Sequence, residues 1–100
     1  MKKTKKQNGK TTTTKVWEVG KSYVIRTVTM IDVGKLIKVT DQELVLDNAC
    51  WIAETGRWAG FLENGNINEA EPFPSGDVII GRGAIIDACE WKHSLDIKQK

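Results

Sequence analysis

Short segments rich in β-branched and aromatic residues recur along this chain, and turn residues separate them. Such segments favour β-strands, because these side chains fit a pleated, half-buried surface. No long helical crossover lies between them, so neighbouring segments are expected to pair antiparallel. Five strands are expected, at residues 22–29, 30–39, 44–54, 77–81 and 84–91.

The second of these segments contains a glycine, Gly34, within its strand pattern. A glycine at such a position marks a bulge, a sharp bend or the close approach of another backbone. Short antiparallel strands with an internal bend are expected to curl into a barrel, because closure removes the exposed edges of a sheet. The predicted fold is therefore mainly β, a small five-stranded antiparallel barrel.

A different pattern interrupts the strands at residues 51–76. Trp58, Phe61 and Leu62 have the i, i+3, i+4 spacing of one helix face, and Gly65 is placed to end that helix. The rest of the stretch carries both prolines of the chain, which are excluded from the interior of a ladder, so it is expected to be irregular. The sequence thus predicts a short helical insertion between the third and fourth strands.

The first 15 residues contain no aliphatic or aromatic residue beyond Met1, so they cannot offset the entropy lost on ordering. Residues 1–15 are therefore expected to form a disordered tail, residues 16–93 a single domain, and residues 94–100 a flexible C-terminus. The tail is basic and contains no acid. Its lysines are Lys2, Lys3, Lys5, Lys6, Lys10 and Lys15.

Charge is distributed unevenly between this tail and the body. The chain has 15 Lys and Arg and 13 Asp and Glu, so without the six tail lysines the body keeps 9 cations against 13 acids, a net charge of −4. A basic arm on an acidic body suits contact with nucleic acid or another polyanion. A tail that only improves solubility is the alternative. The small body is also expected to gain stability by forming an oligomer.

The sequence predicts neither a secretory signal nor a membrane span. Cys50 and Cys89 lie far apart and fit no metal-binding or redox spacing, so both are expected to be buried, reduced thiols. We therefore expect a cytoplasmic protein with no metal and no cofactor.

Two stretches resemble the motifs of the Sm-like family of small β-barrels, which includes the Hfq type. The first motif has a glycine in a bent second strand, a turn with an aspartate, and a third strand. The second motif has a glycine-containing turn between two apolar strands. The resemblance covers residues 21–50 and 77–90. The matching residues are Gly34, Leu36, Asp41, Leu46 and Ala49 in the first motif and Arg82 and Gly83 in the second.

This resemblance implies a ring-like homo-oligomer, for example a hexamer, in which the fourth strand of one subunit pairs with the fifth strand of the next. It also implies RNA binding. The sequence departs from the family at three places: a basic tail replaces the N-terminal helix, the turn after Val39 lacks the base-binding asparagine, and the connection at residues 51–76 is longer than usual.

A second similarity is to small proteins encoded by tailed phages. These carry an "IRT" strand, a segment rich in Ala, Arg and Trp, and a short helix, as do residues 24–64 here. Some small phage proteins are oligomers that sequester the cyclic nucleotide signals of bacterial immunity. The similarity implies an anti-defence phage protein that binds a nucleotide or cyclic nucleotide in the cytoplasm of a bacterial host.

Arg82 lies between Gly81 and Gly83 and between two apolar strands. Such small neighbours let backbone amides approach a ligand closely, and amides together with a guanidinium form a suitable cradle for phosphate. We therefore expect these three residues to bind a ligand at a subunit boundary. In the alternative interpretation, the glycines are turn residues and Arg82 is a solvated tip.

Two further arginines belong to the predicted ligand site. Arg26 lies among apolar strand residues and needs a partner, either an acid such as Asp87 or a ligand phosphate. Arg57 is flanked by Trp51 and Trp58, whose aromatic faces suit stacking on a base. In the alternative interpretation, the aromatic residues of this segment form core.

An enzyme is not expected, because the sole histidine, His93, lies near the polar C-terminus and no nucleophile–base pair can be assembled. Three functions remain open. The chain is an oligomeric nucleotide-binding protein, an Sm-like RNA-binding module that uses the basic tail, or a structural protein without a small ligand.

Overall fold

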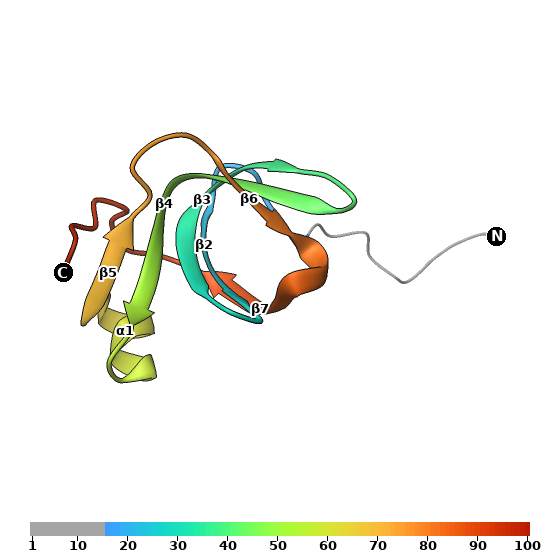
Figure 1. Cartoon of the computed structure of the whole chain (residues 1–100). Helices are drawn as coiled ribbons and strands as arrows, with labels where there is room; N and C mark the ends of the chain where they lie inside the picture. The colour runs from blue at the N-terminus through green and yellow to red at the C-terminus, as the bar shows by residue number, and fades with distance from the viewer. Residues whose placement is uncertain (1–15) are drawn as a thin grey trace.

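The computed structural model describes residues 16–100, which form one sheet of six antiparallel strands with a single α-helix and a 3-10 turn (Figure 1). The predicted tail, residues 1–15 with its six lysines, lies outside the described residues. The elements are β2 (Ser22–Thr27), β3 (Ile31–Val39), β4 (Glu43–Glu54), α1 (Trp58–Asn64), β5 (Glu69–Pro72), β6 (Val78–Gly81), η1 (Arg82–Ala84) and β7 (Ile85–Glu90).

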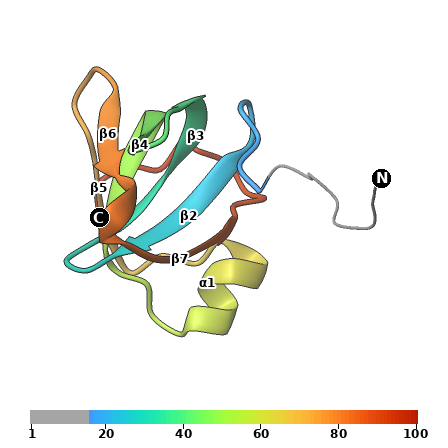
Figure 2. The same ribbon diagram turned by 90° about the vertical axis from the view of Figure 1, so that its right-hand side faces the viewer.

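The strands run in the order β5-β4-β3-β2-β7, and β6 pairs with the first part of β4. With 12 residues, β4 is long enough to pair with β6 through Glu43–Leu46 and with β5 through Cys50–Glu54. The sheet curves on itself, and η1 leads directly from β6 into β7 (Figure 1, Figure 2).

The sheet is not closed. Within residues 16–100, β6 pairs with β4 and β7 pairs with β2, but β6 and β7 do not pair with each other. The Gly-Arg-Gly stretch therefore does not join two strands of a hairpin, because η1 carries the chain from one edge of the sheet to another. The predicted mainly β, antiparallel fold is confirmed, whereas the closed barrel is not.

Gly34 lets β3 and β4 approach each other closely, as predicted. A Cβ atom at this position would lie 3.1 Å from the Leu46 Cβ and 3.2 Å from the Ala49 Cα. The register between the two strands shifts here, and Asn48 adopts a left-handed φ of 53°. Such irregularities bend a strand, which explains how the two parts of β4 reach different partners.

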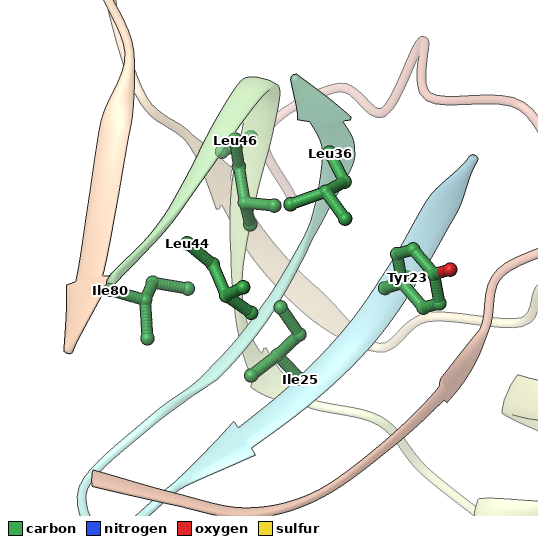
Figure 3. Packing of buried hydrophobic residues seen from close by; sticks show 7 residues of the cluster. Tyr23, Ile25, Leu36, Leu44, Leu46 and Ile80 are labelled. Carbon is green, nitrogen blue, oxygen red and sulfur yellow. The ribbon is translucent and has the colours of Figure 1, made fainter. Parts of the chain in front are cut away.

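A first core fills one face of the curved sheet. Alternate residues of β2, Tyr23 and Ile25, point into it, as do Leu44 and Leu46 of β4, because successive side chains of a strand point to opposite faces (Figure 3). The buried members of this core are Tyr23, Ile25, Leu36, Leu44, Leu46, Ala49 and Ile80.

A second core lies on the opposite face, where α1 and the C-terminal segment cover the sheet. Its buried members are Val24, Val33, Cys50, Ile52, Phe61, Ala70 and Trp91. The Phe61 ring lies 4.9 Å from the Trp91 ring. Burial on both faces explains why adjacent residues of β2 are apolar.

Residues 94–100 contact the body more than their polar composition predicts. Leu95 and Ile97 pack against the second core. The backbones of Lys100 and Ala70 exchange two hydrogen bonds of 3.0 and 3.1 Å. The His93 Nε2 atom lies 2.8 Å from the carbonyl oxygen of Leu62. The last residues of the chain therefore continue beside β5.

Helix α1 confirms the predicted insertion. It begins at Trp58, and Gly65 ends it with a φ of 75° while its N–H bonds to the Phe61 carbonyl at 3.0 Å. No helix within residues 16–100 combines the length and apolarity needed to cross a membrane.

Two predictions are corrected. The stretch expected to be irregular contains β5, so the sheet has six strands and not five. Pro72 ends β5 opposite Cys50, and it is tolerated because it is the last residue of a strand at the edge of the sheet. Cys50 is buried as expected, but Cys89 is exposed because β7 is also an edge strand.

Candidate functional site

The predicted ligand residues divide between the two ends of β3. Arg82, Gly81 and Gly83 lie beside the β3–β4 turn. Arg26 lies beside the β2–β3 turn, where it lines a groove with Trp51. The structure therefore does not assemble one site from all of these residues.

Arg82 is fastened to the β3–β4 turn. Its Nη1 donates to the Thr40 carbonyl at 2.6 Å, and its backbone N–H donates to the Gln42 carbonyl at 2.8 Å. The Thr40 hydroxyl oxygen in turn accepts the Glu43 N–H at 2.9 Å. These bonds hold the guanidinium in place, so Arg82 is not a freely solvated tip.

The glycines beside Arg82 leave open space. A Cβ atom on Gly81 or Gly83 would meet no atom within 4 Å, and neither residue has a positive φ. The backbone conformation therefore does not require glycine at either position. What the two glycines provide is a bare surface on each side of Arg82, which allows a ligand to approach the backbone.

A groove with a volume of about 780 Å³ runs past Arg82. We call it the Arg82–Trp17 groove; it is lined by Val16, Trp17, Glu18, Val19, Val39 and Arg82. The Trp17 ring packs edge-on against Tyr23 at 5.1 Å, and the Tyr23 hydroxyl accepts the Glu18 N–H at 2.9 Å. The groove thus brings together a fixed guanidinium and an ordered indole ring.

Arg26 forms a bidentate ion pair with Asp87, the acid that the sequence suggested as its partner. The Arg26 Nε donates to Asp87 Oδ1 at 2.7 Å, and Nη2 donates to Oδ2. The hydrogen bonds from Arg26, more than its charge, lower the pKa of Asp87. The guanidinium also lies 5.0 Å from the Trp58 ring. Its charge is therefore already paired.

Arg57 does not join this group. It is exposed at the N-terminus of α1, and its side chain does not cap the helix. Trp58, expected beside Arg57, instead stacks on Phe61 at 5.3 Å and faces Arg26. Trp51 is 37% exposed and lines the groove at the β2–β3 turn.

A smaller pocket of about 180 Å³ lies beside that groove. We call it the Trp51 pocket; it is lined by Met30, Trp51, Glu71, Pro72, Phe73 and Pro74. The neighbouring carboxyl group of Asp32 is buried, and its Oδ1 has no hydrogen-bond partner within residues 16–100. This desolvation raises the pKa of Asp32 to about 6.

Sequence reasoning missed three residues of these sites, Trp17, Asp32 and Phe73. A signal existed for Asp32, because it occupies the same alternating positions of β3 as Gly34 and the buried Leu36. No such pattern marked Trp17 or Phe73, which lie outside the strands.

Comparison of the chain with family models, with curated proteins and with solved structures finds no match. Within residues 16–100, no three His, Cys, Asp or Glu side chains gather so as to hold a metal ion. The function is therefore argued from the two sites themselves.

Proposed function

We propose that this chain is a non-enzymatic, homo-oligomeric protein that binds a phosphate-bearing nucleotide in the Arg82–Trp17 groove. One observation carries the proposal: a guanidinium anchored at Thr40 and an indole ring line the same groove, between glycines that leave the backbone bare. A guanidinium has five N–H donors, and the bond to Thr40 occupies one of them. The others suit phosphate oxygens, and the indole suits a base.

The basic tail supports a phosphate ligand at this groove. Residue 15 directly precedes Val16, which lines the groove, so the segment with the six lysines is covalently joined to a residue of the groove. A free nucleotide and an RNA chain share this chemistry. They differ in how much they need the tail, because an extended polyanion gains affinity from each lysine that displaces its counterions.

The open edges of the sheet support the oligomer. β6 and β7 are both edge strands, and η1 with Arg82 lies between them. Each edge exposes an isoleucine, Ile79 at 65% and Ile86 at 64%. We propose that the curved sheet is a small Sm-like barrel left open at this seam, and that β6 of one subunit pairs with β7 of the next. The nucleotide would then lie near the subunit boundary.

The test is a titration of the full chain with AMP and with a short oligoadenylate RNA, combined with native mass spectrometry of the assembly. Arg82→Ala and Trp17→Leu are each expected to weaken AMP binding by at least about tenfold, the effect of losing a charged hydrogen bond or a base stack. Arg57→Ala is the matched control and should change nothing.

Deletion of residues 1–15 distinguishes a free nucleotide from an RNA chain as the ligand. A nucleotide-binding protein keeps its affinity for AMP without the tail, whereas an RNA-binding module loses affinity and salt dependence together. AMP binding that is unchanged in both Arg82→Ala and Trp17→Leu would contradict the proposal, because the nucleotide would then lie outside the Arg82–Trp17 groove. No AMP binding by the unaltered chain would contradict it as well, and Arg82 would then serve only to fasten η1 to the β3–β4 turn.

A further inference from the structure

We propose that the Trp51 pocket is a second binding site, which takes one lysine or arginine side chain of a basic peptide. This site goes beyond the proposed function, because it lies at the other end of β3 from the Arg82–Trp17 groove and selects the opposite charge. Strand register, the unpartnered Oδ1 of Asp32, and the size and lining of the pocket all point to such a ligand.

Strand register places three side chains of the site in one row. Asp32 of β3 is directly opposite Trp51 of β4, and Trp51 is directly opposite Glu71 of β5. Residues directly opposite each other in antiparallel strands share a face, with Cβ atoms about 5 Å apart. Asp32, Trp51 and Glu71 therefore project from the same face of the sheet.

Two members of this row, Trp51 and Glu71, line the Trp51 pocket. Met30 and Phe73, which lie just outside β3 and β5, line it with them. The pocket therefore lies over the face from which Asp32 projects, and Asp32 is the neighbour of both Met30 and Trp51.

Asp32 is the residue that favours a positively charged ligand. Asp32 is only 5% exposed, and its buried Oδ1 is unpartnered within residues 16–100. A buried carboxylate is unfavourable unless a cation or a hydrogen-bond donor pairs with it. Its cross-strand partners, Ile25 and Trp51, offer no cation. Asp32 is thus a buried acid that a cation from a partner would stabilise.

The lining of the pocket suits a cation on an aliphatic stem. Trp51 and Phe73 are each about one-third exposed and present aromatic surfaces. Aromatic faces attract ammonium and guanidinium groups. Pro72 and Pro74 give apolar walls, and Glu71 adds a second carboxyl group. Two carboxyl groups would repel a phosphate, so this pocket does not suit the nucleotide of the first site.

The size of the pocket limits the ligand to a single side chain. Its volume of about 180 Å³ is smaller than the roughly 300–1,000 Å³ of sites for drug-sized ligands. Because the Asp32 Oδ1 has almost no exposed surface, direct contact with it requires a side chain that lines the pocket to move. Met30 is unbranched and 45% exposed, so it can move at little cost.

A partner of basic character fits the charge of the surrounding surface. The body carries a net charge of −4, from 9 cations and 13 acids once the six tail lysines are removed. A basic peptide would be attracted to such a body and could then place one side chain in the pocket. The occupant we assign is therefore a lysine- or arginine-bearing segment of a partner protein.

The test uses N-acetyl-lysine methylamide as the probe and N-acetyl-norleucine methylamide as its uncharged counterpart. Each is titrated into the full chain at neutral pH, and ¹H–¹⁵N NMR follows the backbone and the Trp51 indole. The lysine probe is expected to shift signals of Met30, Trp51 and Phe73 and to bind at least about threefold more tightly than norleucine, as a partly exposed cation–π and ion-pair contact predicts.

Two variants and a control complete the test. Asp32→Asn and Glu71→Gln are each expected to weaken binding of the lysine probe by about threefold, whereas Glu63→Gln, an exposed acid on α1, leaves it unchanged. The Glu71 substitution keeps the test valid if Asp32→Asn does not fold. Equal binding of norleucine and lysine, or an affinity that neither variant changes, would overturn the proposal. The proposal would also be overturned if AMP shifted the NMR signals of Trp51 but not those of Trp17.

Discussion

At the scale of single residues, Asp32 is the group whose ionisation most affects stability. Burial raises its pKa from 3.8 to about 6 in the folded protein, while the unfolded chain keeps the ordinary value. Between these values the folded state holds the proton that the unfolded state has lost. The free energy of unfolding therefore falls as the pH rises from about 4 to about 6, and the loss persists above that range.

Asp32→Asn is expected to stabilise the protein at neutral pH, because the amide cannot ionise. A difference of about 2 pKa units corresponds to at most about 3 kcal/mol. Urea unfolding of both proteins at pH 7.5 and below pH 4 checks this, since the gain should vanish when the native carboxyl is protonated. The exposed Asp47→Asn serves as control and should stay within about 0.5 kcal/mol at each pH. A gain that is equal at both pH values would contradict the role of ionisation.

Gly34 is the residue whose missing side chain matters most. In Gly34→Ala the new Cβ would lie 3.1 Å from the Leu46 Cβ and 3.2 Å from the Ala49 Cα, atoms fixed by the backbone of β4. Overpacking of this kind destabilises by about 1–3 kcal/mol. Urea unfolding measures the change. Gly83→Ala is the matched control, because its Cβ meets no atom within 4 Å. Similar stability in the two variants would refute the close approach.

At the scale of elements, the segment after His93 completes the second core. Leu95 and Ile97 pack against it, and Lys100 exchanges backbone hydrogen bonds with Ala70 of β5. Removal of residues 94–100 is therefore expected to lower the free energy of unfolding by about 2 kcal/mol, the value of burying about one large apolar side chain.

Hydrogen exchange of the Ala70 amide gives a local readout of the same truncation, because this amide donates to Lys100 at 3.1 Å. It should lose protection, while the Phe61 amide, bonded to Arg57 within α1, should keep it. If the truncated chain retained full stability and Ala70 stayed protected, the C-terminus would be flexible, as its polar composition predicts.

At the scale of the whole molecule, the proposed oligomer depends on the open edges of β6 and β7. Ile79 on β6 is 65% exposed, and a charged side chain on an edge strand prevents strands from pairing. Ile79→Lys is expected to convert the assembly to monomers in sedimentation experiments. Val28→Lys changes an equally exposed side chain at the β2–β3 turn and should leave the assembly intact. Dissociation by both variants, or by neither, would contradict pairing through β6.

The two proposed sites lie at different ends of β3 and select ligands of opposite charge. The Arg82–Trp17 groove adjoins a tail with six lysines, and the Trp51 pocket adjoins Asp32 and Glu71. β3 connects them, since Val39 lines the groove and Asp32 lies near the start of the strand. A ring formed through β6 and β7 would therefore present nucleotide sites and peptide sites to different surroundings.

The amino-acid sequence by itself determined the local structure. The spacing of Trp58 and Phe61 in α1 and the helix end at Gly65 depend on near neighbours, and both are confirmed. Gly34 predicted a bulge, a sharp bend or a close approach of another backbone, and the structure shows the close approach together with a shift in register.

Only the tertiary structure decided which residues share a site. Arg82 and Arg26 were expected together, but the order of the strands places them at different ends of β3. Likewise, register between three strands brings Asp32, Trp51 and Glu71 into one row. β5 formed despite its proline because Pro72 is the last residue of a strand at the edge of the sheet. Register and strand order link residues distant in sequence, and local propensity carries no information about them.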